Sequence, residues 1–281
     1  MGLFNFNYNK EGPGISKDAP KKRTFVVFFE TFFRNFWKFA PISAVFSLIS
    51  APLVTTGLAA VGMTNVARNT ARDKHSFGLS DFFETIKKNW RQALIAGIIN
   101  TLIYGVLLFD FFYFYGATGK FSAIFLGIVI AMLFIFTVMN FYVWTLIITF
   151  KFSLKQVYKN SFKFVFINLK NNLICFFSQL LVIGIYVGIL FLFLKSFVLV
   201  LTIEMIVFVT TFPSFKFLLE QFCAFPAIKK FIIDPYYEAH PNEDIEKRRD
   251  LGLEIPEEKT DEDTEEENDQ ENVFSDSIIE D

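Results

Sequence analysis

Residues Phe121–Phe150 read FSAIFLGIVIAMLFIFTVMNFYVWTLIITF, a run of thirty residues without a charged side chain. The next segment, Lys151–Lys170, reads KFSLKQVYKNSFKFVFINLK and carries five lysines. An α-helix of about 20 apolar residues crosses the hydrocarbon of a bilayer, and loops rich in Lys and Arg stay in the cytoplasm. The boundary at Phe150 therefore predicts a membrane-spanning helix that ends at a basic, cytoplasmic connection.

Three more apolar runs of similar length flank these segments: Leu94–Tyr115, Leu173–Leu194 and Phe197–Phe215. The connections Gly116–Lys120 and Lys195–Ser196 hold one lysine each, so basic residues gather on alternate connections only. This asymmetry predicts that both chain termini are cytoplasmic. The 281 residues are 53% hydrophobic and include 40 Phe, which is more apolar surface than a soluble domain needs. We predict an all-α fold, a polytopic helical membrane bundle. The sequence contains no Asn-X-Ser/Thr sequon, which is consistent with a bacterial cytoplasmic membrane.

Residues 36–67 form a further apolar region, which contains Pro41, Pro52 and Gly57 and is flanked by basic residues on both sides. A single crossing would place one basic flank outside the cytoplasm, whereas a helix–break–helix that returns keeps both flanks inside. Pro52 lacks a backbone donor and Gly57 frees the backbone, so we place the break at Ser50–Gly57. We favour this re-entrant hairpin over a single span. The expected bundle has four clear transmembrane helices plus this broken segment, five to six membrane segments in all.

A basic–aromatic motif precedes two of the apolar regions. Phe28-Phe29-Glu30-Thr31 is followed by Arg34-Asn35, and Phe82-Phe83-Glu84-Thr85 is followed by Lys88-Asn89 at the same spacing; a looser third copy covers Phe162–Asn168. Such stretches are typical of amphipathic cytoplasmic helices at the membrane surface, with Lys and Arg facing anionic headgroups. Either the chain holds three units of interfacial helix plus hairpin, or the likeness is a coincidence. The candidate partner-contact residues in these stretches are Lys87, Lys88, Trp90, Arg91, Lys155 and Lys163.

Composition divides the chain into four regions. Residues 1–24 form a cytoplasmic basic arm, residues 25–225 the helical membrane domain, and residues 226–250 a cytoplasmic juxtamembrane segment that starts where Pro226 interrupts the last helix. Residues 251–281 are dominated by Asp and Glu, and we expect a disordered acidic tail because so polar a segment cannot offset its ordering entropy.

Enzyme motifs are absent from the sequence, which has no phosphate-binding glycine loop, His-Glu-X-X-His, Cys-X-X-Cys or Gly-X-Ser-X-Gly. We therefore predict no catalytic residue, no metal site and no cofactor, and we expect no nucleic-acid partner. His75 and His240 lie in segments expected outside the membrane, without nearby ligand partners.

Four polar residues inside the apolar runs are candidate intramembrane site residues: Glu204, Asn140, Gln179 and Asn100. A carboxylate at mid-depth is costly unless it is protonated, paired or facing water, so Glu204 is the sharpest candidate. It is either functional or a protonated group that is hydrogen-bonded to a neighbouring helix. The three amides are candidate hydrogen-bond partners of Glu204, and for the amides alone, hydrogen bonding between helices is the favoured interpretation.

Several short motifs occur in one order between Gly12 and Pro241. They are, along the chain, Gly12-Pro13-Gly14, Pro20-Lys21-Lys22, Phe36-Trp37-Lys38, the PLVTTG of Pro52–Gly57, Asp81-Phe82-Phe83, Lys88–Ala93, Asp234-Pro235-Tyr236-Tyr237 and His240-Pro241. In this order the chain resembles the YesL family of bacterial integral membrane proteins. The resemblance implies an accessory component of carbohydrate uptake, associated with ABC-type sugar transporters and without known catalytic residues.

The leading hypothesis is a non-enzymatic integral membrane accessory protein of a carbohydrate ABC uptake system. Its basic interfacial helices would contact permease subunits and the anionic headgroups of the bilayer. The alternative is a self-contained small-solute transporter or channel, with a polar mid-membrane path along the 50–57 break, Glu204 and Asn140. An enzyme that acts on lipids or cell-wall precursors is the least favoured class. The sequence indicates neither the sugar nor the oligomeric state.

Overall fold

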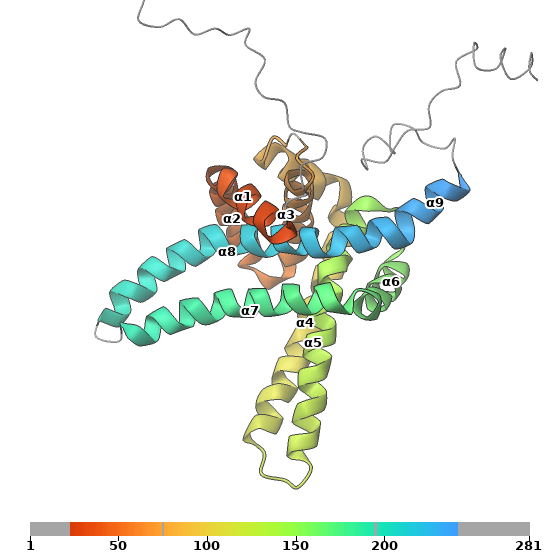
Figure 1. Cartoon of the computed structure of the whole chain (residues 1–281). Coiled ribbons are helices and arrows are strands. Elements are labelled where there is room, and N and C mark those ends of the chain that lie inside the picture. Colours follow the sequence, from red (N-terminus) through yellow and green to blue (C-terminus); the bar gives the residue numbers. More distant parts are fainter. Residues whose placement is uncertain (1–22, 75, 194–195, 241–281) are drawn as a thin grey trace, which may run out of the picture. The chain divides into compact units, whose positions relative to one another are not determined.

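The computed structural model describes residues 23–74, 76–193 and 196–240 (Figure 1), and the regular elements in these ranges are all helical. They are α1 (Thr24–Arg34), α2 (Phe36–Ser50), the 3₁₀ turn η1 (Leu53–Thr55), α3 (Thr56–Ala71), α4 (Leu79–Gly116), α5 (Ser122–Thr149), α6 (Leu154–Ile167), α7 (Leu169–Leu192), α8 (Phe197–Ile228), the π-helical turn η3 (Lys229–Ile233) and α9 (Asp234–Ala239). The predicted all-α class is confirmed. Residues 1–22 of the basic arm, His75 and the acidic tail lie outside the described residues.

Four helices are long and apolar enough to span a membrane: α4, α5, α7 and the helical segment that begins with α8 at Phe197. Each of them includes most or all of one predicted apolar run. The 28 residues of α5 alone extend for about 42 Å, against roughly 30 Å of hydrocarbon in a bilayer. These lengths fit a multi-pass membrane protein, as predicted.

The helix α3 is enclosed by α2, α4 and α5. Ten of its 16 residues are buried, and many of them are small. Gly57 of α3 faces Gly97 of α4 so closely that a Cβ atom on Gly57 would lie 2.7 Å from the Cα of Gly97. Two facing glycines therefore allow the backbones of α3 and α4 to touch.

The first apolar region folds as helix, break and helix. α2 and α3 pack against each other, and at 15 and 16 residues each reaches only about 22 to 24 Å, less than the hydrocarbon thickness. Pro52 lies in the break, where the Thr55 hydroxyl donates to the carbonyl of Ile49 at the end of α2. Gly57, which we had placed in the break, instead lies in the first turn of α3, because the helix resumes directly after η1.

The last long helix, α8, continues through two prolines. Pro213 has no N–H to bond the carbonyl of Val209 four residues earlier, and the hydroxyl of Ser47 in α2 donates to that carbonyl at 3.2 Å instead. Pro226 does not end the helix, which continues to Ile228.

The chain divides into two compact units, residues 1–227 and 228–281. In the second unit η3 packs against α9, and the ring Nδ1 of His240 lies 3.0 Å from the carbonyl oxygen of Tyr236.

Candidate functional site

Buried amides link α4, α5 and α6. Asn100 Nδ2 donates to Asn140 Oδ1 at 2.6 Å, and the Tyr158 hydroxyl of α6 donates to Asn100 Oδ1 at 2.8 Å. Asn140 Nδ2 donates to the carbonyl of Phe136 in its own helix at 2.9 Å. Burial raises the pKa of Tyr158, so its phenol stays protonated and remains a donor. Two of the predicted polar residues therefore meet, and they join three helices.

A further hydrogen bond joins α4 to the residues just before α6. Gln92 Nε2 donates to the carbonyl of Phe152 at 2.7 Å, just before α6 begins. α6 starts with a capping box, in which Ser153 Oγ accepts from the backbone N–H of Gln156 and the Gln156 side chain accepts from the backbone N–H of Ser153. Hydrogen bonds of Gln92 and Asn100 of α4 therefore reach the residue before the α6 capping box and Tyr158 within α6.

The Lys and Arg residues of both helices are exposed. We define the basic face as six exposed side chains, Lys87, Lys88, Trp90, Arg91, Lys155 and Lys163. Trp90 is 49% exposed, and the guanidinium carbon of Arg91 lies 5.2 Å from the centroid of its ring. On the opposite side of α6, Val157, Phe164 and Val165 are buried. The basic face thus combines cations with one large aromatic ring, and buried residues pack α6 against the rest of the bundle.

An ion pair within α8 has a buried carboxylate that also contacts α7. Lys216 Nζ lies 2.7 Å from Glu220 Oε1, and Gln179 Nε2 donates to the same oxygen at 3.4 Å. The side chain of Glu220 is 1% exposed and that of Lys216 is 28% exposed. We ended the last apolar run of the sequence at Phe215 and so missed this carboxylate. The i, i+4 spacing of Lys216 and Glu220 was the signal that could have found it.

Glu204 stands apart from these networks. It lines an apolar crevice of about 320 Å³ between α7 and α8, together with Tyr186, Ile189 and Val207. One of its carboxylate oxygens is buried and has no hydrogen-bond partner among the described residues. Gln179, a predicted partner of Glu204, bonds Glu220 instead.

No hydrogen bond between described residues joins the helix break at residues 50–57 to Glu204 or to Asn140. The carbonyl of Leu53, beside Pro52, accepts from the Thr101 hydroxyl at 3.2 Å, and Gly57 packs on Gly97. The described residues also contain no group of three His, Cys, Asp or Glu side chains that could hold a metal ion. The helix break, Glu204 and Asn140, which were proposed to line a polar mid-membrane path, thus each contact different residues.

Other interhelical hydrogen bonds were not predicted. They join Tyr142 to Asn172 (2.6 Å), Arg68 to Thr149 (2.8 Å) and Gln221 to Thr145 (2.9 Å). No signal in a single sequence identifies such a pair, because each bond depends on which helix lies opposite. They show that many buried polar groups in this chain hold helices together.

The contact between α3 and α4 lies in a region that matches a known family. Residues 42–111 match the family described as protein of unknown function, DUF624. The match begins in α2 and ends close to the end of α4, so it includes the helix break, the Gly57–Gly97 contact and the α4 part of the basic face. It covers about a quarter of the chain. No curated protein and no solved structure matches the chain.

Proposed function

We propose that this protein is a non-enzymatic integral membrane accessory protein of a bacterial carbohydrate ABC uptake system, and that it is a member of the YesL family. The observation that carries the proposal is the basic face. Its side chains are exposed on two adjoining helices, while the amides behind them bond α4, α5 and α6 to one another. A charged surface on a rigid support is suited to steering and orienting a partner.

The basic face also suggests the chemistry of that partner. Arg and Trp are enriched where protein surfaces bind each other, and here Arg91 stacks on an exposed Trp90. The complementary surface is an acidic, partly apolar patch on the cytoplasmic side of a permease subunit. Lysines of the face that do not meet the permease would face anionic headgroups of the bilayer. In this proposal both termini are cytoplasmic.

The family match supports the importance of the same part of the chain. It covers the α4 half of the basic face together with the enclosed helix α3 on which α4 packs. We infer that the family retains α3 as the support and the start of α4 as the contact.

The proposal is tested by reversing one charge in the face. We compare Arg91→Glu with Lys120→Glu, an equal reversal at an exposed residue beyond the other end of α4. The full chain is co-expressed with the permease subunits, and the co-purified permease and the sugar uptake of the cells are measured. Arg91→Glu should lower the recovered permease about tenfold, because it puts like charges together across the interface. Equal recovery with both variants would refute the proposal.

A second candidate function is a self-contained small-solute transporter or channel. The observation that favours it is Glu204, which lines an apolar crevice and has a buried oxygen without a partner among the described residues. Reconstituting the purified protein alone into proteoliposomes separates the two functions. Solute movement without permease subunits, lost in Glu204→Gln, would support the transporter; uptake that always requires the permease supports the accessory role.

A further inference from the structure

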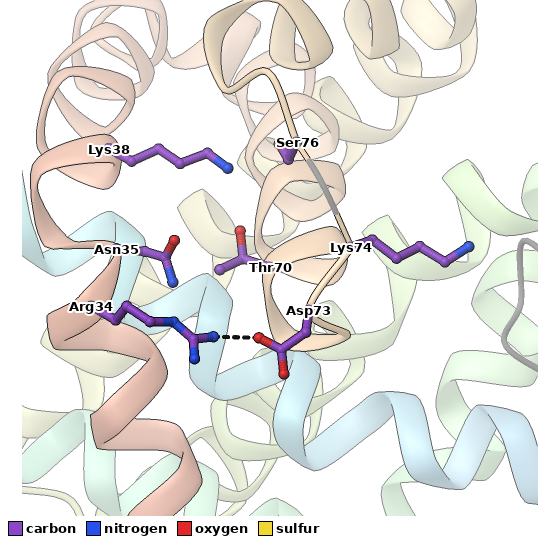
Figure 2. Close-up of a pocket in the computed structure, with 7 residues that line it drawn as sticks. All are labelled: Arg34, Asn35, Lys38, Thr70, Asp73, Lys74 and Ser76. Carbon is purple, nitrogen blue, oxygen red and sulfur yellow. Dashed lines mark hydrogen bonds and ion pairs between the residues drawn. The ribbon is translucent and has the colours of Figure 1, made fainter. Parts of the chain in front are cut away.

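A polar cavity of about 440 Å³ lies apart from the basic face, between the α1–α2 junction and the connection from α3 to α4 (Figure 2). Its lining is Arg34, Asn35, Lys38, Thr70, Asp73, Lys74 and Ser76. Figure 2 shows Arg34 and Lys38 extending toward the connection, whereas the ammonium group of Lys74 extends away from them. Arg34 and Lys38 are therefore the cations that face the cavity.

One wall of the cavity is built by the interruption between α1 and α2. α1 ends at Arg34, and the amide of Asn35 donates to the carbonyl of Thr31 at 2.9 Å, which closes the last turn. Arg34 and Lys38 are four residues apart across this junction, so both side chains reach the same side. The junction thus presents a guanidinium and an ammonium group to the cavity, with Asn35 between them (Figure 2).

The other wall is the end of α3. The backbone N–H of Lys74 donates to the carbonyl of Asn69 at 2.9 Å and that of Asp73 to the carbonyl of Thr70 at 3.1 Å, which is the bonding pattern of a Schellman motif. Asp73 has a φ of 50°, the left-handed conformation that this motif requires. The motif turns the chain so that the Asp73 carboxylate meets Arg34, and the two form an ion pair.

Hydrogen-bond donors among the described residues of the lining include those of Arg34, Asn35, Lys38 and Ser76. Ser76 is buried and its oxygen already accepts from the backbone N–H of Gly78 at 3.3 Å, which leaves its O–H to donate. The amide of Asn35 has a second hydrogen beside the one given to Thr31. Asp73 is the one acid in this lining, and the charge of Asp81 also acts on Lys38. An anion with several oxygen atoms, above all a phosphate group, fits a guanidinium, an ammonium and two neutral donors.

Exposed aromatic side chains adjoin the cavity in the sequence. Phe33 precedes Arg34, Phe77 follows Ser76, and Trp37, which precedes Lys38, is 86% exposed. Such residues are typical of the boundary between headgroups and acyl chains. We propose that this cavity binds a phosphate group, and that the three exposed aromatic side chains Phe33, Trp37 and Phe77 favour the headgroup phosphate of an anionic phospholipid.

The first test is a gain of affinity. Asp73→Asn removes the charge that occupies Arg34 but retains a residue that tolerates positive φ. The full chain in detergent is titrated calorimetrically with dihexanoyl phosphatidylglycerol below its micellar concentration. Asp73→Asn should bind this lipid about threefold more tightly, because an exposed ion pair competes only weakly. The control is Glu238→Gln, which removes the same charge from an exposed position on α9 and should leave the affinity unchanged.

The second test is a loss of affinity. Lys38→Gln should weaken binding of the lipid about tenfold, since an ion contact inside the cavity is lost. Lys159→Gln removes the same charge from an exposed position on α6 and should weaken it much less. If the two substitutions in the cavity shift the affinity no more than their controls do, attraction to the anion is diffuse and the proposal is overturned.

Titration with inorganic phosphate identifies the source of the phosphate group. Weaker binding of inorganic phosphate than of dihexanoyl phosphatidylglycerol, with both affinities raised by Asp73→Asn, supports the headgroup. Equal or tighter binding of inorganic phosphate, also raised by Asp73→Asn, supports the cavity but overturns the role of the three exposed aromatic side chains. The permease recovery assay above does not depend on these residues, so the two proposals fail independently.

Discussion

At the scale of single residues, a buried amide pair fixes two helices in one register, because a shift of either helix leaves a donor or an acceptor unbonded. Asn100 and Asn140 form such a pair at 2.6 Å between α4 and α5. Tyr158 adds α6 to the same pair. The polar groups behind the basic face are therefore structural members of the bundle.

The pair Asn100–Asn140 predicts non-additive stability. We expect Asn100→Leu and Asn140→Leu each to lower the free energy of unfolding in mixed micelles, with a coupling energy of about 0.6 to 1.7 kcal/mol in the double-mutant cycle. The coupling arises because either substitution alone already breaks the shared bond. Strictly additive losses would show that the two amides do not bond in the membrane.

The two carboxylates of α8 should respond differently to neutralisation. Glu220→Gln leaves the ammonium of Lys216 without its anion and should lower the free energy of unfolding by about 2 kcal/mol, since charged hydrogen bonds are worth that much. Glu204→Gln replaces a carboxylate oxygen that has no partner among the described residues, and should change stability little. Chemical denaturation of both variants in the same detergent measures the difference, and a larger loss for Glu204→Gln would contradict the structure.

At the scale of helices, the contact between α3 and α4 depends on two residues without side chains. Gly97→Ala would place a Cβ atom 2.9 Å from the Cα of Gly57, so the helices must separate. We expect a loss of about 1 to 3 kcal/mol of unfolding free energy, as for other overpacked cores. The readout is the thermal midpoint of the detergent-solubilised protein.

A matched control lies on the same helix. A Cβ atom on Gly105 would meet no described atom within 4 Å, so Gly105→Ala should be neutral or stabilise α4 through its higher helix propensity. If both alanine substitutions had the same effect, the close approach of α3 and α4 would be excluded.

The repeated motif shows what local sequence determines. Asn35 donates to the carbonyl of Thr31 at 2.9 Å, and Asn89 donates to the carbonyl of Thr85 at 3.0 Å, so both copies form the same hydrogen bond. The helix is interrupted at Asn35 but continues past Asn89. After Asn89 the bond of Gln92 to Phe152 and the packing of Gly97 on α3 keep α4 continuous. Such tertiary contacts are not encoded in the motif itself, and so the sequence alone did not predict the difference.

At the scale of the whole chain, hydropathy was sufficient to predict the long helices, because a run such as Phe121–Phe150 has no alternative to crossing hydrocarbon. The candidate site was predicted only in part. Exposure of Lys87 and Arg91 follows from helical periodicity, and Asn100 and Asn140 were identified as buried amides. Their mutual bond, and the choice of Glu220 over Glu204 as the partner of Gln179, depend on which helices are neighbours.

The orientation of the chain remains a prediction with a direct test. Cys175 and Cys223 are replaced by alanine, and single cysteines are introduced as Lys88→Cys and Lys120→Cys, both exposed positions near opposite ends of α4. A membrane-impermeant maleimide should label position 120 from outside intact cells and position 88 only after lysis, because the basic connections stay in the cytoplasm. Labelling of both positions from the same side would show that α4 does not cross the bilayer.

The contact between Ser47 and the carbonyl of Val209 has a consequence for the order of assembly. Pro213 leaves this carbonyl unbonded within α8, so inserting α8 alone would carry a bare acceptor into lipid. α2 is synthesised long before α8 and can already be in position to supply the missing donor when the last helix leaves the ribosome. We therefore expect completion of the bundle to depend on the prior insertion of its first hairpin.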